Sequence, residues 1–171
     1  MEVLPYKIAT LLYAFDREDR VLLMQRAKEP NQGLWSPSGG KLETSIGESP
    51  HDCAIREAEE ELGIAIESRD LHLTGLVSEQ GYLGQAHWLM FLFEIKPRLT
   101  AIPSPHPEGK FSFFTRSEIA NLPIPETDRE TIWPLFWQHR GGFFSAHCST
   151  AEGVSNRWTL EESRVHSSVH D

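Results

Sequence analysis

The sequence predicts an α+β fold, in which pairs of strands stand before and after a helix with clear start and end signals. Three observations support this. Aliphatic and aromatic segments occur in pairs separated by short polar or glycine-containing turns. An acidic segment just after residue 48 carries helix signals at both ends. Two further cap signals follow late in the chain.

The first predicted strands cover 6–15 and 20–26, because both segments are rich in aliphatic residues and the charged segment between them suits a turn. A second predicted hairpin covers 71–79 and 86–96, around the turn Gly81-Tyr82-Leu83-Gly84. Its apolar run 88–93 favours a strand buried on both faces.

The segment 97–107 contains four prolines and no helical period, so it predicts a loop. A strand over 111–115 follows it. Near the end of the chain, 143–149 and 156–164 flank Ala151-Glu152-Gly153 and predict a C-terminal hairpin.

The central helix is predicted over 50–62. Ser49 is a good N-cap, Pro50 suits the first helical position, and Asp52 completes an approximate capping box. Gly63 is placed to end the helix in the left-handed conformation. The apolar positions recur every four residues, at Ala54, Ala58 and Leu62.

Two shorter helices are predicted later. Thr115 with Glu118 makes a capping box for a helix that ends near residue 123. Thr127 with Glu130 makes another, and Pro134 is expected to interrupt or shorten the helix that follows.

The central helix concentrates negative charge on one face. Glu57, Glu60 and Glu61 are three or four positions apart, so their carboxylates are expected to converge. Two such charges repel by roughly 3 kcal/mol at an effective dielectric of about 20. A divalent cation such as Mg²⁺ or Mn²⁺ would reverse that cost, because such cations select hard oxygen ligands. An ordinary solvated helix face is the alternative.

Composition predicts one compact domain over 1–165 with a polar tail over 166–171. The chain has 171 residues and a formal net charge of −9, which disfavours nucleic-acid polymers and anionic membranes as partners. No apolar run approaches the roughly 20 residues of a membrane span, so a cytoplasmic protein is expected, as monomer or homodimer. Cys53 and Cys148 are expected to be buried free thiols.

The acidic segment resembles the Nudix box. Glu48, the run Arg56-Glu57-Ala58-Glu59-Glu60-Glu61, and Leu62-Gly63-Ile64 match that pattern at the proper spacing. One departure is that seven residues, rather than five, separate Gly40 from Glu48, which indicates a two-residue expansion of the loop before the helix. Loops absorb such insertions at small entropic cost, so the site is expected to persist.

The resemblance implies an α/β/α sandwich around a mixed central sheet. Within the family, the segment 33–41 and the segment 128–144 look most like MutT-type nucleoside triphosphate pyrophosphohydrolases. In that subgroup the late helix and its entry loop line a base pocket.

The resemblance also implies the roles of individual residues. Glu57 or Glu60 would orient or deprotonate the attacking water, with Arg56 holding a carboxylate in place. Gly40, Glu48 and Gly63 would be structural positions of the box. The implied metal ligands are Glu57, Glu60, Glu61 and the Gly39 carbonyl, and Glu108 is a further candidate ligand or base.

Substrate contacts are the least specific part of the resemblance. Arg26 and Lys41 lie where the subgroup contacts phosphates, although each would also be an ordinary surface cation. Asp128 could accept hydrogen bonds from a purine edge, or serve only as a first-turn acid of its helix. Trp35 and Trp133 could stack on the base, or belong to the core.

Three functions follow as hypotheses. The first is Mg²⁺- or Mn²⁺-dependent hydrolysis of a purine nucleoside triphosphate, oxidised forms included, to monophosphate and pyrophosphate. The second is hydrolysis of a nucleoside diphosphate conjugate such as ADP-ribose or a sugar nucleotide. The third is a non-hydrolytic nucleotide-binding module on the same fold. Metal-dependent activity separates the third from the others, and product identity separates the first two.

Overall fold

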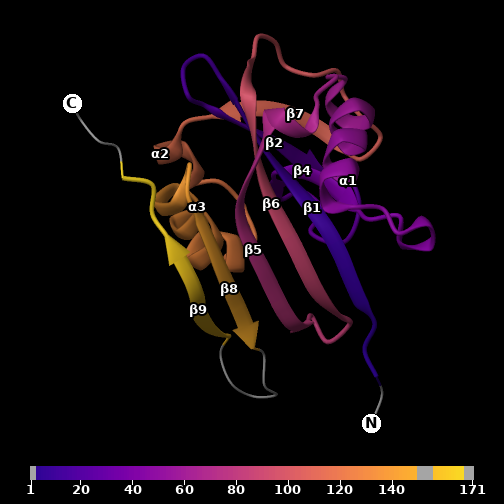
Figure 1. Cartoon of the computed structure of the whole chain (residues 1–171). Helices are drawn as coiled ribbons and strands as arrows, with labels where there is room; N and C mark the ends of the chain where they lie inside the picture. The colour runs from indigo at the N-terminus through magenta and orange to yellow at the C-terminus, as the bar shows by residue number, and fades with distance from the viewer. Residues whose placement is uncertain (1–2, 150–155, 168–171) are drawn as a thin grey trace.

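The computed structural model describes residues 3–149 and 156–167 (Figure 1). Within these residues, nine strands form one mixed sheet. The strands are β1 Tyr6–Asp16, β2 Val21–Arg26, β3 Trp35–Ser36, β4 Ser38–Lys41, β5 Leu71–Tyr82, β6 Ala86–Leu99, β7 Gly109–Phe114, β8 Phe143–Ser149 and β9 Arg157–Arg164. The helices and turns are η1 Thr44–Ile46, α1 Pro50–Glu57, η2 Ala58–Leu62, η3 Ser68–Asp70, α2 Arg116–Ile119, η4 Asp128–Ile132 and α3 Trp133–His139.

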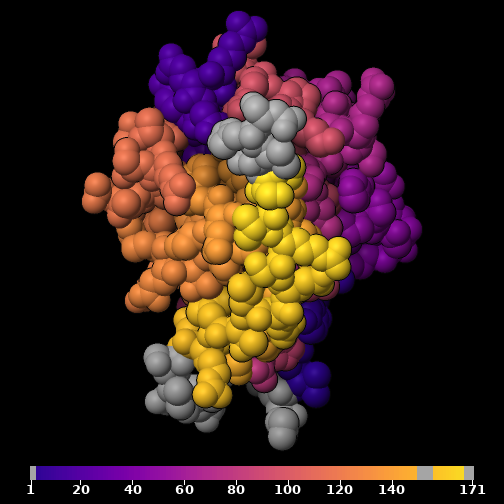
Figure 2. Space-filling view, turned by 60° about the vertical axis from the view of Figure 1, so that its left-hand side comes forward, coloured from indigo at the N-terminus to yellow at the C-terminus, as the bar shows by residue number. Residues whose placement is uncertain are grey.

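The sheet has the order β3-β2-β1-β6-β5-β8-β9, with β4 paired to β1 and β7 paired to β2. Strand β1 runs parallel to β6, and β5 runs parallel to β8, whereas the hairpin partners are antiparallel. Strand β9 lies at the edge of the sheet and on the surface of the molecule (Figure 2). The mixed sheet and the predicted hairpins are therefore confirmed. The turn proposed at 151–153 lies outside the described residues.

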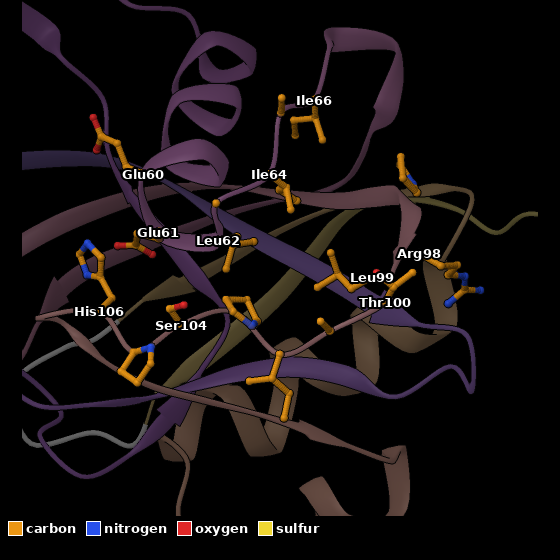
Figure 3. Close-up of a pocket in the computed structure, with 17 residues that line it drawn as sticks. Glu60, Glu61, Leu62, Ile64, Ile66, Arg98, Leu99, Thr100, Ser104 and His106 are labelled. Atoms are coloured by element: carbon orange, nitrogen blue, oxygen red, sulfur yellow. The ribbon is translucent and has the colours of Figure 1, made fainter.

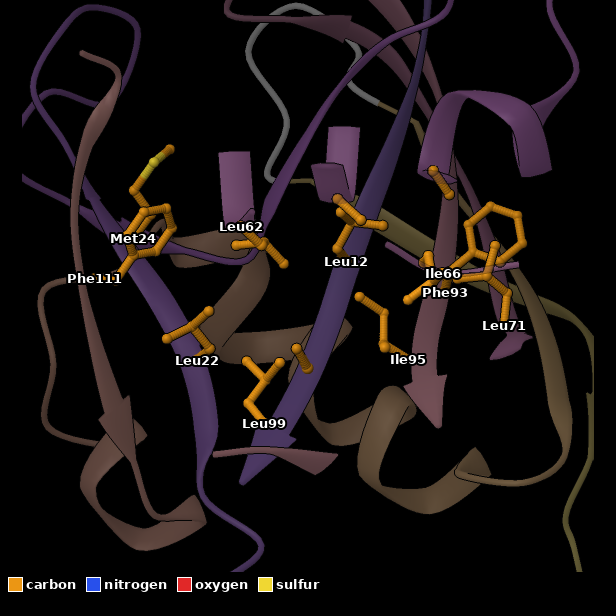
Figure 4. Close-up of a cluster of buried hydrophobic side chains, with 13 residues drawn as sticks. Leu12, Leu22, Met24, Leu62, Ile66, Leu71, Phe93, Ile95, Leu99 and Phe111 are labelled. Carbon is orange, nitrogen blue, oxygen red and sulfur yellow. The ribbon is translucent and has the colours of Figure 1, made fainter. Parts of the chain in front are cut away.

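Helices cover the two faces of the sheet, as the alternation along β1 shows. Leu12 belongs to a buried cluster that includes Ala54, Ala58 and Leu62 of the central helix (Figure 4). Its neighbour Tyr13 belongs to a second cluster, which includes residues of η4 and α3. Because successive side chains of a strand point to opposite faces, the sheet lies between the helices. The α/β/α sandwich is confirmed.

The central helix follows its predicted signals. The Ser49 side chain accepts a hydrogen bond from the Asp52 N–H at 3.1 Å, and Gly63 has φ +67°. From residue 58 the helix widens into the π-type turn η2, which contains the acidic residues. Helical structure over 50–62 is confirmed, with a wider last turn than expected.

Cys53 and Cys148 are buried free thiols, as predicted.

The late helix differs from the prediction at both marked positions. Thr127 is already helical and its side chain makes no cap hydrogen bond, because the helix begins one residue earlier, after Pro125. Pro134 does not end the helix, since α3 continues through it to His139. Pro134 lies in the first turn of α3, directly after the π-type turn η4. Its missing N–H therefore falls where the helical hydrogen-bond pattern is already irregular. The predicted cap at Thr115 is confirmed, because its side chain accepts from the Glu118 N–H.

Strand β6 corrects two further expectations. It extends to Leu99, so Pro97 lies in the strand and the loop begins later than predicted. The last pairing of β6 with β5 is at Ile95, which leaves Pro97 where β5 needs no N–H donor. The segment 88–91 is only partly buried, because the helices leave that end of the sheet open (Figure 1).

Within the described part of the chain, no helix is long and apolar enough to cross a membrane.

Candidate active site

A two-point ion pair ties the loop before the helix to the helix itself. Arg56 Nε donates to Glu48 Oε2 at 3.1 Å, and Arg56 Nη2 donates to Glu48 Oε1 at 3.0 Å. The Arg56 hydrogen bonds hold the pKa of Glu48 below its usual value. Arg56 also donates to the Lys41 carbonyl at 3.2 Å, which joins the end of β4 to the same anchor.

The expanded loop between Gly40 and Glu48 does not disturb this anchor. It contains the turn η1, which ends in the left-handed conformation at Gly47, φ +64°. The insertion is thus taken up before Glu48, and the predicted tolerance of the site to it agrees with the intact Glu48–Arg56 pair.

Glu57 lies buried against β4, at 8% exposure. Its Oε1 accepts from Arg56 Nη1 at 2.9 Å. Burial, followed by the negative charge of Glu61, raises the pKa of Glu57 to about 7. Gly40 leaves space for this carboxylate, since a Cβ on Gly40 would lie 2.1 Å from Glu57 Oε1 and displace it.

Glu61 and Glu60 point to different partners from the same turn. Glu61 Oε2 accepts from the Ser38 hydroxyl and, at 3.3 Å, from the Gly39 N–H. Burial raises the pKa of Glu61. Glu60 is 58% exposed and lies 3.5 Å from Arg56 Nη1. Ser38, which the sequence did not single out, is therefore a member of the site.

The three carboxylates do not form a ready-made metal cage. Among the described residues, no group of three or more His, Cys, Asp or Glu side chains is placed to hold a metal ion. Arg56 holds Glu57 and Ser38 holds Glu61, so the predicted set of metal ligands stays a prediction. The donors nevertheless fit a divalent cation, because they are hard oxygens on one turn. Burial, followed by the charge of Glu61, raises the pKa of Glu57, and a bound cation would oppose both effects.

Glu108 lies in the loop before β7, next to the site. Its carboxylate is 3.7 Å from Lys28 Nζ, and its charge contributes to the raised pKa of Glu61. Its backbone N–H donates to His106 Nδ1 at 3.2 Å. The structure thus brings Glu108 near residues 57–61, which we call the acidic turn, while its predicted role as ligand or base stays a prediction.

A cavity of about 700 Å³ opens beside the acidic turn (Figure 3). Glu60, Glu61 and His106 line one end of it, and Arg98 lies at the other. Aliphatic side chains form its walls: Leu62 at the end of η2, Ile64 and Ile66 after it, Leu99 at the end of β6, and Ile102 in the loop that follows.

The residues expected to contact phosphates lie on different strands. Arg26 Nε donates to the Pro30 carbonyl at 2.7 Å. Lys41 is exposed at the end of β4, and its Nζ lies 5.9 Å from the centre of the Trp88 ring. Lys41 is the last residue of the glycine-containing strand β4, and Arg26 is the last residue of β2, where it pairs with Gly109 next to Glu108.

The residues expected to contact the base divide into core and surface. Trp133 is 4% exposed and packs against Tyr13 and Trp137, so its expected base contact is replaced by a core role. Trp35 is partly buried, with its ring edge-on to Phe114. Asp128 is half-buried, and burial together with the charge of Glu79 raises its pKa to about 7.

Sequence reasoning missed Glu79 and Trp88, which face each other across β5 and β6. Glu79 is 6% exposed, and burial raises its pKa to about 7. A signal was available: two-residue alternation along β5 places Glu79 on the same face as the buried Val77.

Comparison with known proteins gives a consistent family. The NUDIX domain family matches residues 5–133. The uncharacterized Nudix hydrolase YvcI of Bacillus subtilis is 34% identical over 113 residues, which are 65% of this chain and 68% of that protein. A Mycobacterium tuberculosis protein provisionally named 8-oxo-dGTP diphosphatase 3 is 28% identical over 125 residues, which are 70% of this chain and 56% of that protein.

Solved structures share the fold. The MutT protein of Bacillus halodurans has a TM-score of 0.69 at 24% identity, covering 91% of this chain and 97% of that one. The MutT protein of Methanosarcina mazei has a TM-score of 0.67 at 21% identity, covering 82% of this chain and 97% of that one.

Proposed function

This chain belongs to the Nudix hydrolase family, whose members act on pyrophosphate bonds and generally use divalent cations, and we propose that it hydrolyses a purine nucleoside triphosphate to monophosphate and pyrophosphate. The observation that carries the proposal is the buried Glu57 carboxylate, held by Arg56 beside the glycine strand β4. Mg²⁺ or Mn²⁺ is the proposed cofactor.

The residues of the acidic turn have separate tasks in this proposal. Glu57, Glu60, Glu61 and the Gly39 carbonyl would hold the cation, which would polarise phosphate oxygens and a bound water. Glu57 or Glu60 would orient or deprotonate the attacking water. The water oxygen bonds to phosphorus as the anhydride bond breaks, and the leaving phosphate keeps the bonding electrons. Arg56 fixes the position of Glu57 throughout.

Two features support a purine triphosphate as substrate. Lys41 lies at the end of the glycine strand, where it can meet a phosphate, and the half-buried Asp128 offers acceptor oxygens to a base edge. The similarity to the Mycobacterium tuberculosis protein named for 8-oxo-dGTP points to the same class.

The cavity beside the acidic turn favours a second candidate. Its volume of about 700 Å³ falls in the range of small-molecule sites, and it begins at Glu60 and Glu61. It leaves room for a group attached beyond the second phosphate, as in ADP-ribose or a sugar nucleotide. The intact acidic turn favours hydrolysis over a non-hydrolytic role.

Hydrolysis of a substrate panel tests the proposal. The panel contains canonical and oxidised nucleoside triphosphates, ADP-ribose and sugar nucleotides, each with Mg²⁺, Mn²⁺ or a chelator. We expect a purine triphosphate to yield monophosphate and pyrophosphate only when the cation is present. Preferential cleavage of a conjugate into two monophosphates would replace the first candidate by the second.

A further inference from the structure

His106 stands at the acidic end of the cavity, in the loop before β7. Its ring lies beside Glu61, and Glu60 lines the same end (Figure 3). Arg98 lies at the opposite end and pairs with Asp19 at 2.7 Å. A phosphate held by a cation at the acidic turn would therefore meet the imidazole of His106 and not the guanidinium of Arg98.

The backbone around His106 is fixed on both sides. Pro105 and Pro107 stand directly before and after it, and each restricts the backbone next to it. The His106 N–H donates to the Gly109 carbonyl at 3.0 Å, and the Gly109 N–H donates back to the His106 carbonyl at 2.9 Å. Gly109 begins β7 and lies so close to β2 that a Cβ there would be 2.1 Å from the Gln25 carbonyl oxygen. The sheet thus holds the end of the loop that carries the imidazole.

The two ring nitrogens of His106 have different surroundings. Nδ1 accepts the Glu108 N–H at 3.2 Å, so it carries no proton in the neutral ring. The proton of the neutral imidazole is therefore on Nε2, which makes no hydrogen bond with any residue that the structure describes. The backbone of the loop thus selects the tautomer that offers an N–H donor from Nε2.

The acidic turn explains which acceptor this donor would meet. The carboxylates nearest to it have other partners, since Glu61 accepts from Ser38 and Gly39, and Glu60 lies 3.5 Å from Arg56 Nη1. Mg²⁺ bound by carboxylates commonly takes phosphate oxygens as further ligands. Such a phosphate would bring anionic acceptor oxygens to this end of the cavity.

We propose that His106 is a substrate-contacting residue whose Nε2–H donates to a phosphate oxygen of the nucleotide held at the acidic turn. The inference rests on the proposed hydrolase and assigns the acidic end of the cavity to a phosphate group. Because the acceptor is anionic, this hydrogen bond is stronger than one between neutral groups. His106 then serves substrate binding through one ring nitrogen and the shape of the loop through the other.

Two variants of nearly equal size separate the two nitrogens. In His106→Gln the side-chain amide nitrogen reaches the position of Nε2, whereas in His106→Asn the amide oxygen can replace Nδ1 as acceptor for the Glu108 N–H. His106→Asn therefore keeps the hydrogen bond within the loop and removes the donor, and His106→Gln does the reverse. A purely structural role of His106 would make His106→Gln the more damaging change.

We expect His106→Asn to raise KM for the cleaved nucleotide at least tenfold, with less than about a threefold change in kcat, because a phosphate contact acts in the ground state and the transition state alike. His106→Gln should recover most of the affinity. Calorimetry with inorganic pyrophosphate and Mg²⁺ should give the same order of affinities without turnover. Thermal unfolding should give His106→Asn nearly the wild-type Tm.

The two proposals fail in different ways. If the wild type cleaves no nucleotide of the panel with either cation, the proposed function is wrong, and binding of pyrophosphate still tests His106. The inference about His106 is overturned if folded His106→Asn keeps the wild-type KM and pyrophosphate affinity, or if His106→Gln loses more of either than His106→Asn does. A wild type that binds no pyrophosphate with Mg²⁺ would overturn it as well.

Discussion

Two neighbouring glycines of β4 are required for different reasons at the scale of single residues. A Cβ on Gly39 would lie 1.9 Å from the backbone oxygen of Thr10, which β1 cannot move without breaking its pairing. A Cβ on Gly40 would meet only the carboxylate of Glu57, the far end of a flexible side chain.

The variants Gly39→Ala and Gly40→Ala should therefore differ. We expect Gly39→Ala to lower the free energy of unfolding by about 2 kcal/mol or more, as overpacking against backbone does. Gly40→Ala should lose less than about 1 kcal/mol, yet lower kcat at least tenfold because Glu57 is displaced. Denaturant unfolding and steady-state kinetics on both proteins check this. Equal destabilisation of the two variants would contradict the geometry.

Glu79 predicts a pH dependence of stability. Its pKa rises from 4.5 to about 7 on folding, so the folded state favours the protonated form. Well below pH 4.5 both states are protonated and nothing is lost. Between pH 4.5 and 7 only the unfolded state ionises, so the stability falls by about 3 kcal/mol, and above pH 7 it stays at the lower level. Glu79→Gln should be more stable than the wild type at pH 8 and nearly equal at pH 4.

Chemical unfolding of both proteins between pH 4 and pH 8 measures this difference. A difference that stays constant with pH would show that the Glu79 carboxyl titrates normally in the folded protein.

The limits of the sequence are also clearest in single residues. The spacing of Glu57, Glu60 and Glu61 places them on one turn, and the structure agrees. Spacing alone does not show that Ser38 holds Glu61, because that contact joins residues 23 positions apart in the sequence. The same holds for Trp133, whose burial depends on packing against β1.

At the scale of elements, sequence signals predicted the end of a helix correctly where contacts within a single turn determine that end. Ser49 and Gly63 bound the central helix because each satisfies backbone groups within its own turn. The start of the late helix could not be read in this way, since Thr127 looks like a cap but Pro125 already begins the turn that contains it. The end of β6 was likewise set by a partner strand, because its pairing with β1 continues to Leu99.

One side chain at the end of α3 joins three elements. Arg140 Nε donates to Glu94 Oε1 at 2.6 Å, and its Nη1 lies 3.1 Å from Asp19 Oδ2. Its guanidinium also lies 4.0 Å from the centre of the Phe15 ring. This links the late helix to β6 and to the β1–β2 turn.

Arg140→Lys should lower the free energy of unfolding by about 1–2 kcal/mol, because an ammonium cannot bond both acids and cover the ring. Burial acts to raise the pKa of Asp19, but hydrogen bonds from Arg140 and Arg98 lower it overall. The stabilisation is thus present above the usual Asp pKa of 3.8 and is lost as pH falls through the folded value, so the two proteins should converge in acid.

Thermal unfolding across pH checks the role of Arg140, with Arg157→Lys on the exposed strand β9 as control. A loss for Arg140→Lys no larger than that of the control would contradict it.

For the whole molecule, the acidic turn should couple cation binding to stability. Glu57 and Glu61 have raised pKa values, so binding of Mn²⁺ to the folded state releases protons and relieves repulsion. At a hundredfold excess over Kd, binding adds about 2.7 kcal/mol, or several degrees in Tm for a chain of this size.

Scanning calorimetry of chelator-treated protein with and without Mn²⁺ tests the coupling. The increase in Tm should vanish in Glu57→Gln and persist in Glu59→Gln, since Glu59 is an exposed acid of the same turn. An equal increase in both variants would place the cation elsewhere.

The most direct measurement compares Mg²⁺-dependent turnover of a purine nucleoside triphosphate in the wild type, Glu60→Gln and Glu59→Gln, with products resolved by phosphorus NMR. Glu60 is 58% exposed, so its variant should stay folded. The proposed function predicts monophosphate and pyrophosphate as products, a loss of at least about a hundredfold in Glu60→Gln, and near-native turnover in Glu59→Gln. Near-native turnover by Glu60→Gln would contradict the assignment of the active site to the acidic turn.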